Sequence, residues 1–134
     1  MRYALILFFA LSVCGENPKL DKFFRALAQV ESSGNPRAYN KKEKAIGIYQ
    51  IRPLYYIDSG IPGGHGICYD PVKARAVCEA YFRRYEPKAY ASGDFQTLAK
   101  LHNGGASWRK KDADVQERLR IYWRKVKNEL DKMR

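Results

Sequence analysis

The chain has 134 residues, of which 46% are hydrophobic and 13% aromatic. A chain of this length builds one domain around one core and is too short for two, and its apolar content excludes a disordered protein. With 25 Lys and Arg against 14 Asp and Glu, the formal net charge is +11, which indicates an acidic partner or serves solubility alone. Nucleic acid is the first such partner to consider for a cytosolic protein, and an anionic cell wall is the first for an exported one.

The N-terminal segment differs from the rest of the chain. Arg2 gives a positive start, residues 3–13 (YALILFFALSV) are an apolar run, and Cys14-Gly15 offers small residues for cleavage. This pattern is typical of a secretory signal peptide, and the run is shorter than the ~20 residues that a membrane-spanning helix needs. We therefore predict a signal peptide over 1–15 and a mature domain over 16–134 that is secreted or periplasmic, without stable membrane insertion. A lipoprotein anchored through Cys14 is the alternative, although the residue before it is bulky for that signal.

Outside this segment the chain has two cysteines, Cys68 and Cys78. A disulfide between them suits an oxidising compartment, and two separate buried thiols are the alternative. No CxxC motif or Cys/His cluster suggests a metal site, so we expect neither a metal nor an organic cofactor.

The first half of the chain predicts helices separated by turns. Asn17-Pro18 begins a helix whose apolar residues recur at helical spacing, and the Gly and Pro of residues 31–36 (ESSGNP) end it. Residues 45–51 (AIGIYQI) are short and apolar, so they predict a strand or a buried helical turn. Residues 53–59 predict a short helix, and residues 60–66 (GIPGGHG) predict a flexible loop.

The second half predicts three longer helices. Asp70-Pro71 is a favourable helix start, an N-cap residue followed by proline at the first helical position, and this helix is expected to end near Tyr85. Asp94 caps the next helix, which Asn103-Gly104-Gly105 stops. The last helix begins near Asp112, and its basic residues are interpreted as a solvated face: Arg118, Arg124, Lys125 and Lys127. The sequence therefore predicts one α+β, mostly helical domain with a small irregular or β region near residues 39–51.

Glu31 is the principal candidate for a catalytic residue. It lies four residues after Leu27 and seven after Phe24, on or beside the apolar stripe of the first helix. A carboxyl group in that position loses hydration, which favours its protonated form. A protonated carboxyl can donate its proton to the oxygen of a departing sugar. An ordinary solvated glutamate at a helix end is the alternative interpretation.

The surroundings of Glu31 resemble a known family. Residues 28–52 resemble the lytic transglycosylases in the segment that carries their catalytic glutamate, through Glu31-Ser32, Asn35-Pro36 and 47–51 (GIYQI). Further along, the chain is similar to invertebrate-type lysozymes in residues 47–51, 55–60 (YYIDSG), 101–105 (LHNGG) and 122–126 (YWRKV). The resemblance implies a lysozyme-like fold and cleavage of the β-1,4 bond between N-acetylmuramic acid and N-acetylglucosamine in peptidoglycan.

The resemblance also implies roles for individual residues. Glu31 takes the position of the catalytic acid, and Tyr49 with Gln50 falls where these families line the glycan cleft. His102-Asn103 stands where transglycosylases usually have Tyr-Asn, a pair near the acid and the bound sugar. The change to histidine leaves a structural and a catalytic role for His102 open.

A second carboxylate is not in its expected place. Glycosidases usually use two, and invertebrate-type lysozymes carry an aspartate where this chain has Asn40. Glu43 is the nearest replacement, with a solvated charge as the alternative, and Asp58 is a weaker candidate. Without a second carboxylate, the sugar's own hydroxyl closes onto the anomeric carbon while Glu31 serves as acid and then base.

The sequence thus predicts a lytic transglycosylase that leaves 1,6-anhydro ends. A hydrolytic lysozyme of the invertebrate type is the first alternative, and a non-catalytic cell-wall-binding module is the second. The expected partner is the peptidoglycan glycan strand, not nucleic acid, and a monomer is expected.

Overall fold

The computed structural model describes residues 17–133 as a mostly helical domain with a small two-stranded sheet. The predicted signal peptide, including Cys14, lies outside the described residues. In chain order the elements are α1 (Pro18–Ser32), β1 (Tyr39–Asn40), β2 (Ala45–Ile46), α2 (Pro53–Ser59), the 3-10 helix η1 (His65–Tyr69), α3 (Pro71–Tyr85), α4 (Pro87–Ser92), α5 (Phe95–Gly104), the 3-10 helix η2 (Trp108–Lys110) and α6 (Ala113–Asp131). The predicted fold class is confirmed.

The helices begin where the capping residues predict. The side chain of Asn17 accepts a hydrogen bond from the backbone N–H of Leu20 at 3.2 Å, which satisfies one of the donors that a helix start leaves free. The side chains of three aspartates cap later helices in the same way: Asp70 for α3, Asp94 for α5 and Asp112 for α6. These local hydrogen bonds explain why the start of each of these helices was predictable.

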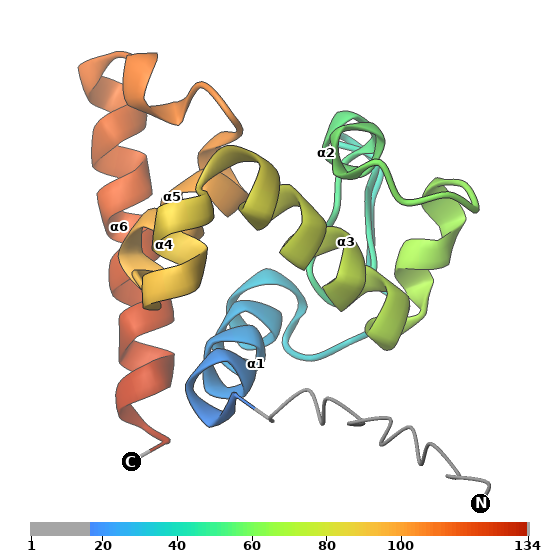
Figure 1. Ribbon diagram of the computed structural model, residues 1–134, viewed down its shortest axis with the longest axis horizontal. Coiled ribbons are helices and arrows are strands. Elements are labelled where there is room, and N and C mark those ends of the chain that lie inside the picture. The colour runs from blue at the N-terminus through green and yellow to red at the C-terminus, as the bar shows by residue number, and fades with distance from the viewer. Residues whose placement is uncertain (1–16, 134) are drawn as a thin grey trace, which may run out of the picture.

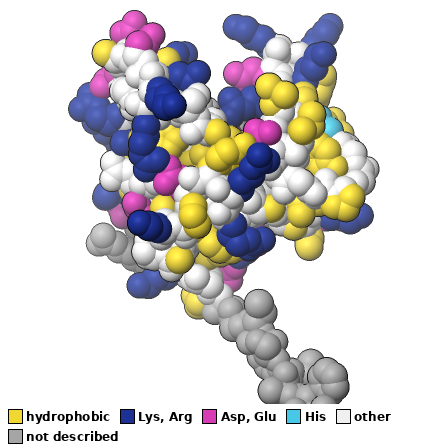
Figure 2. Space-filling view, turned by 45° about the horizontal axis from the view of Figure 1, so that its top comes forward, with side chains coloured by type: hydrophobic (Ala, Val, Ile, Leu, Met, Phe, Trp, Pro, Cys, Tyr) yellow, Lys and Arg dark blue, Asp and Glu magenta, His cyan; other side chains and the backbone are white. Residues whose placement is uncertain are grey.

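The helices form two groups on either side of α3. α1 and α5 both pack against the long α6, whereas α2, the sheet and η1 lie together at the other side of the molecule (Figure 1). Aromatic rings fill the space between α1 and α3, with the Phe24 and Phe82 ring centroids 6.0 Å apart, and Phe23 stacks on Phe95 of α5 at 4.7 Å. The surface is basic over much of the face in Figure 2, which is hollowed at the top between two projecting parts.

Residues 45–51 differ from both predictions made for them. Only Ala45–Ile46 is a strand, paired antiparallel with Tyr39–Asn40, and Ile46 exchanges two backbone hydrogen bonds of 3.0 Å with Ile51 across a tight turn. Gly47 permits this turn because its φ is +80° and a Cβ there would lie 2.0 Å from the Cys68 carbonyl oxygen. The apolar run is therefore a reversal of the chain.

Other differences from the sequence prediction are small. The loop predicted over residues 60–66 gives way to η1 from His65, and α4 and η2 are short helices that the sequence did not predict. Cys68 and Cys78 are free thiols with no exposed surface, and burial raises the pKa of Cys68 to about 11. From residue 17 to residue 133, no helix has the length and apolar character to cross a membrane.

Candidate active site

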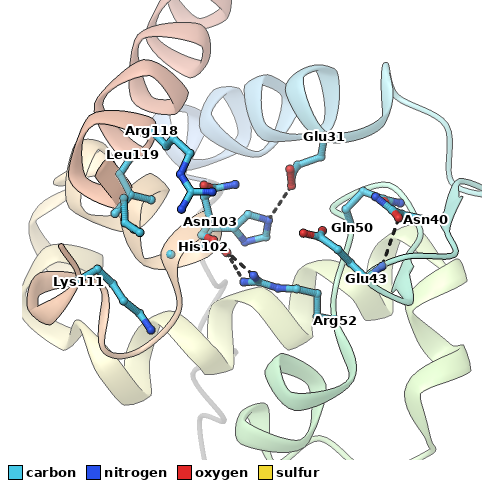
Figure 3. A pocket seen from close by; sticks show the side chains of 12 residues that line it. Glu31, Asn40, Glu43, Gln50, Arg52, His102, Asn103, Lys111, Arg118 and Leu119 are labelled. Carbon is cyan, nitrogen blue, oxygen red and sulfur yellow. Dashed lines mark hydrogen bonds and ion pairs between the residues drawn. The ribbon is translucent and has the colours of Figure 1, made fainter. Parts of the chain in front are cut away.

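Glu31 stands at the edge of a cavity of about 510 Å³ to which distant parts of the chain contribute. The predicted residues Glu43, Gln50, His102 and Asn103 line the same cavity (Figure 3). Glu31 comes from the end of α1, Glu43 from the turn after β1 and Gln50 from the turn before α2. His102 and Asn103 come from the end of α5. The fold therefore brings together most of the site residues that the sequence predicted.

The end of α1 holds Glu31 in place. Ser33, with φ 54°, adopts the left-handed conformation that ends the helix, and its N–H bonds back to the last turn. The hydroxyl of the neighbouring Ser32 lies 2.8 Å from the carbonyl oxygen of Ile48 and so ties this helix end to the 45–51 turn. Only 16% of the Glu31 side chain is exposed, so its carboxyl group has partial access to the cavity and little hydration.

His102 is the polar centre of the site. It is 3% exposed, and its Nε2 lies 2.9 Å from the carbonyl oxygen of Tyr49 and 3.6 Å from Oε2 of Glu31. Its Nδ1 lies 2.9 Å from the hydroxyl of Tyr55. Because a carbonyl oxygen only accepts, Nε2 carries a proton, and in the neutral ring Nδ1 accepts from the Tyr55 hydroxyl.

Tyr55 and its neighbours make the His102 network a buried one. The Tyr55 ring stacks on Tyr81 with centroids 3.7 Å apart. Burial raises the pKa of Tyr55 well above its usual value, so the hydroxyl keeps its proton. The structure thus assigns His102 a fixed orientation and a fixed tautomer facing Glu31.

Glu43 is the second carboxylate that the structure places in this cavity. It is exposed, lies in the turn between β1 and β2, and forms no ion pair with any described residue. The side-chain oxygen Oδ1 of Asn40 accepts hydrogen bonds from the backbone N–H groups of Lys42 at 3.0 Å and of Glu43 at 3.3 Å. Asn40 therefore shapes the turn that presents Glu43. Asp58, the weaker candidate, lines only a neighbouring cavity.

The other predicted residues differ in what they offer to the cavity. Gln50 has φ 52° and donates from Nε2 to the carbonyl oxygens of Ala38 and Gly47 at 3.3 and 3.0 Å. Asn103 is exposed at the end of α5. The side chain of Tyr49, by contrast, is 7% exposed and packs edge-on against Phe24 with centroids 5.2 Å apart, away from the cavity lining. Tyr49 contributes its carbonyl oxygen to the site.

The residues lining this cavity offer no metal cage. In the part of the chain that the structure describes, no group of three or more His, Cys, Asp or Glu side chains is placed to hold a metal ion.

Comparison with known proteins gives the family of the chain. The transglycosylase SLT domain matches residues 16–118, which include α1 and every residue lining the Glu31 cavity except Leu119. The chain belongs to the transglycosylase SLT domain family. The predicted resemblance is confirmed.

The relatives of this SLT domain chain are named lysozymes. Invertebrate-type lysozyme 6 of Caenorhabditis elegans is 31% identical over 117 residues, which cover 77% of this chain and 81% of that protein. Lysozyme 1 of Crassostrea virginica is 32% identical over 85 residues, covering 60% of this chain and 46% of its own length. A lysozyme of Ostrea edulis is 32% identical over 87 residues, covering 63% and 60%. The chain thus spans about half the length of the first of these oyster relatives and three fifths of the second.

Sequence reasoning missed several residues of the SLT domain's cavity. Arg52, Lys111 and Arg118 all line it, although Arg118 was interpreted as part of a solvated helix face.

The hydroxyl of Tyr122 is buried without a hydrogen-bond partner among residues 17–133. Burial, and after it the charge of Glu31, raises the Tyr122 pKa well above its usual value. The apolar spacing of α6 predicted packing for Tyr122 and gave no signal for its hydroxyl, because helical periodicity reports only which face is buried.

Proposed function

We propose that this chain is a secreted or periplasmic, monomeric glycosidase that cleaves the β-1,4 bond between N-acetylmuramic acid and N-acetylglucosamine in peptidoglycan. The observation that carries the proposal is the position of Glu31, which is 16% exposed at a cavity of about 510 Å³ with the Nε2 of His102 at 3.6 Å. Membership of the SLT domain family and the lysozyme relatives support the same activity.

Glu31 is the acid of the proposed reaction. Its side chain is 16% exposed and lines the cavity, which places the carboxyl group where it can donate a proton to the glycosidic oxygen. When the proton leaves, a carboxylate remains, and the N–H at Nε2 of His102 faces it at 3.6 Å. An N–H dipole in a buried position stabilises a carboxylate more strongly than it would in water. His102 is therefore a positioning residue that also stabilises the deprotonated acid.

Transglycosylation is the favoured route because it needs a single carboxyl group. The bond between the anomeric carbon and the glycosidic oxygen breaks, and the proton of Glu31 goes to the departing oxygen. The C6 hydroxyl of the N-acetylmuramic acid then bonds the anomeric carbon, and its proton returns to Glu31. The product is a 1,6-anhydro sugar, water is not consumed and the acid is restored.

Hydrolysis by a pair of carboxylates is the second candidate, and the position of Glu43 in the same cavity favours it. A second carboxylate acts either as a base toward water or as a nucleophile toward the sugar. Glu43 is exposed and unpaired with described residues, as a base that acts on solvent water would be.

Mass spectrometry of fragments released from purified peptidoglycan tests these proposals. Anhydro-ended fragments support the transglycosylase, and reducing ends support the lysozyme. We expect Glu31→Gln to abolish release in either case, whereas Glu43→Gln abolishes release only if the reaction is hydrolytic. The matched control Glu129→Gln, on the far part of α6, should release fragments as the parent does. Absence of release by the parent from several walls would leave a cell-wall-binding module as the function.

A further inference from the structure

Three cations line the Glu31 cavity without a carboxylate partner. Arg52 precedes α2, Lys111 precedes α6, and Arg118 lies on the second turn of α6. None of them forms an ion pair within the described range 17–133, whereas Arg75 and Arg109 do so elsewhere, with Asp21 and Glu86. Three separate segments therefore bring cations to a cavity that Glu31 and Glu43 also line, and none of the three is held in an ion pair with a described residue.

Arg52 is the most firmly placed of the three. Its guanidinium donates to the carbonyl oxygens of His102 at 3.2 Å and of Asn103 at 3.4 Å. A guanidinium has five N–H donors, so these two bonds orient the group and leave others for a ligand. An arginine oriented in this way loses little conformational freedom when it binds a carboxylate.

Arg52 and Lys111 also line a second cavity of about 450 Å³, whose lining includes Tyr81 and the carboxylates of Glu43 and Asp58. The two cavities share Arg52, Lys111 and other residues, so they adjoin one another. A chain-like ligand that extends from Glu31 into the second cavity passes both cations.

Charge is separated within the Glu31 cavity. Figure 3 shows Glu31 and Glu43 on one side, with Arg118 and Lys111 on the opposite side and Arg52 reaching between them from below. An anionic group bound to the cations therefore avoids the side from which Glu31 donates its proton. The acidic wall of the cavity is left for the sugar and the bond to be cut.

We propose that Arg52, Lys111 and Arg118 form a carboxylate-binding subsite that selects an acidic muramic acid-containing glycan over a neutral polymer of N-acetylglucosamine. N-acetylmuramic acid carries a lactyl ether whose carboxyl group is free or extended by a peptide with its own carboxylates, and chitin has no such group. Charge-assisted hydrogen bonds from Arg and Lys are the strongest that a protein offers a carboxylate. The inference rests on the proposed function and adds the group that the site recognises.

Calorimetric binding in the Glu31→Gln background tests the subsite without turnover. The two ligands are a muropeptide tetrasaccharide with free carboxylates and chitotetraose. We expect the acidic ligand to bind more tightly, and Lys111→Gln or Arg118→Gln to weaken it about twofold to fivefold each, with about tenfold loss in the double variant. Binding of chitotetraose should be unchanged, and Lys73→Gln, an exposed lysine outside both cavities, should change neither ligand.

Three further measurements test the role of charge in binding. The affinity for the acidic ligand should fall between 50 and 500 mM NaCl, because the screening length shortens from about 14 Å to about 4 Å over this range, and the affinity for chitotetraose should not fall. Amidation of the ligand's carboxylates should abolish its advantage. Arg52→Lys keeps the positive charge and removes the several fixed N–H donors of the guanidinium. We expect this variant to bind the acidic ligand more weakly and chitotetraose as tightly as before.

An unchanged ratio of acidic to neutral affinity in the Lys111→Gln and Arg118→Gln double variant would overturn the subsite. If the parent still cleaved peptidoglycan in that case, the proposed function would stand alone. If the parent cleaved no wall while the double variant lost acidic binding selectively, the subsite would stand and the proposed activity would fail.

Discussion

The buried contact between His102 and Tyr55 gives a quantitative prediction. His102 is 3% and Tyr55 4% exposed, and two hydrogen bonds of 2.9 Å join the imidazole to the Tyr55 hydroxyl and the Tyr49 carbonyl oxygen. His102→Phe leaves both partners buried without that bond, at a cost of about 1–3 kcal/mol each. We therefore expect the variant to lose roughly 2–6 kcal/mol of the free energy of unfolding, a large part of the total for a domain of this size.

A double-mutant cycle isolates the contact. Tyr55→Phe alone leaves Nδ1 of His102 without its donor and should cost about 1–3 kcal/mol. In the double variant neither group remains to be left unpaired, so the two losses should overlap by about 1 kcal/mol or more. Urea unfolding followed by circular dichroism measures all four proteins. Tyr69→Phe removes a tyrosine hydroxyl that forms no hydrogen bond with residues 17–133, so its free energy of unfolding should stay within about 0.5 kcal/mol of the parent's.

The cycle would refute the proposed network in either of two ways. Additive losses from His102→Phe and Tyr55→Phe would mean that the two side chains do not interact energetically. A His102→Phe variant as stable as the parent would mean that the imidazole is not the buried hydrogen-bonding centre described above. Measuring fragment release by His102→Gln, which keeps polar atoms, then separates a loss of activity from a loss of folding.

Three more outcomes are expected from the local environment of single residues. Gly47→Ala should lower the free energy of unfolding by roughly 3 kcal/mol or more, because its Cβ would lie 2.0 Å from the Cys68 carbonyl oxygen at φ +80°. Gly34→Ala, with φ +77° and nothing within 4 Å of its Cβ, should lower it by about 1 kcal/mol. Equal losses of the two variants in urea unfolding would contradict the steric argument. A disulfide reagent should leave the Cys68 and Cys78 thiols unlabelled in the native protein and label them in denaturant. Both thiols are buried, and burial raises the pKa of Cys68 to about 11. Rapid labelling of the native protein would be inconsistent with the packing of α3. Burial raises the pKa of Tyr49 to about 12, so this tyrosine ionises at lower pH in the unfolded chain than in the folded one. The free energy of unfolding should therefore fall by roughly 2–3 kcal/mol from this group as the pH rises from about 10 to 12. Tyr49→Phe should lessen that fall, and an identical pH profile for the variant would argue against a buried hydroxyl.

Local signals explain why the helices were predictable. Asn17, Asp70, Asp94 and Asp112 each cap a helix through a bond to an N–H two or three residues away, so the nearby sequence contains the whole interaction. The apolar spacing of α1 likewise placed Glu31 correctly beside the core. The 45–51 turn was not predictable in the same way, because its shape depends on the contact of Gly47 with Cys68, twenty-one residues further on.

The residues of the candidate site likewise differ in whether the nearby sequence could predict them. Glu31, Gln50, His102 and Asn103 were identified from short motifs, and the fold brings them to one cavity. The orientation of His102 depends on Tyr55, which is 47 residues away in sequence, and no periodic pattern reports such a pairing. Tyr49 shows the converse: its motif predicted a side chain in the cleft, and packing against Phe24 turned that side chain into the core.

By itself the sequence predicted the longer helices, the candidate acid and the family, since these depend on capping bonds, apolar spacing and short motifs that act over a few residues. The tertiary structure alone decided which charges face Glu31. Arg52, Lys111 and Arg118 have no shared spacing or motif, and as exposed or half-exposed residues they leave no trace in the hydrophobic pattern. They meet because α6 packs against both α1 and α5 and because Arg52 donates to the carbonyl oxygens at the end of α5, and only this tertiary arrangement brings the three basic residues to one cavity.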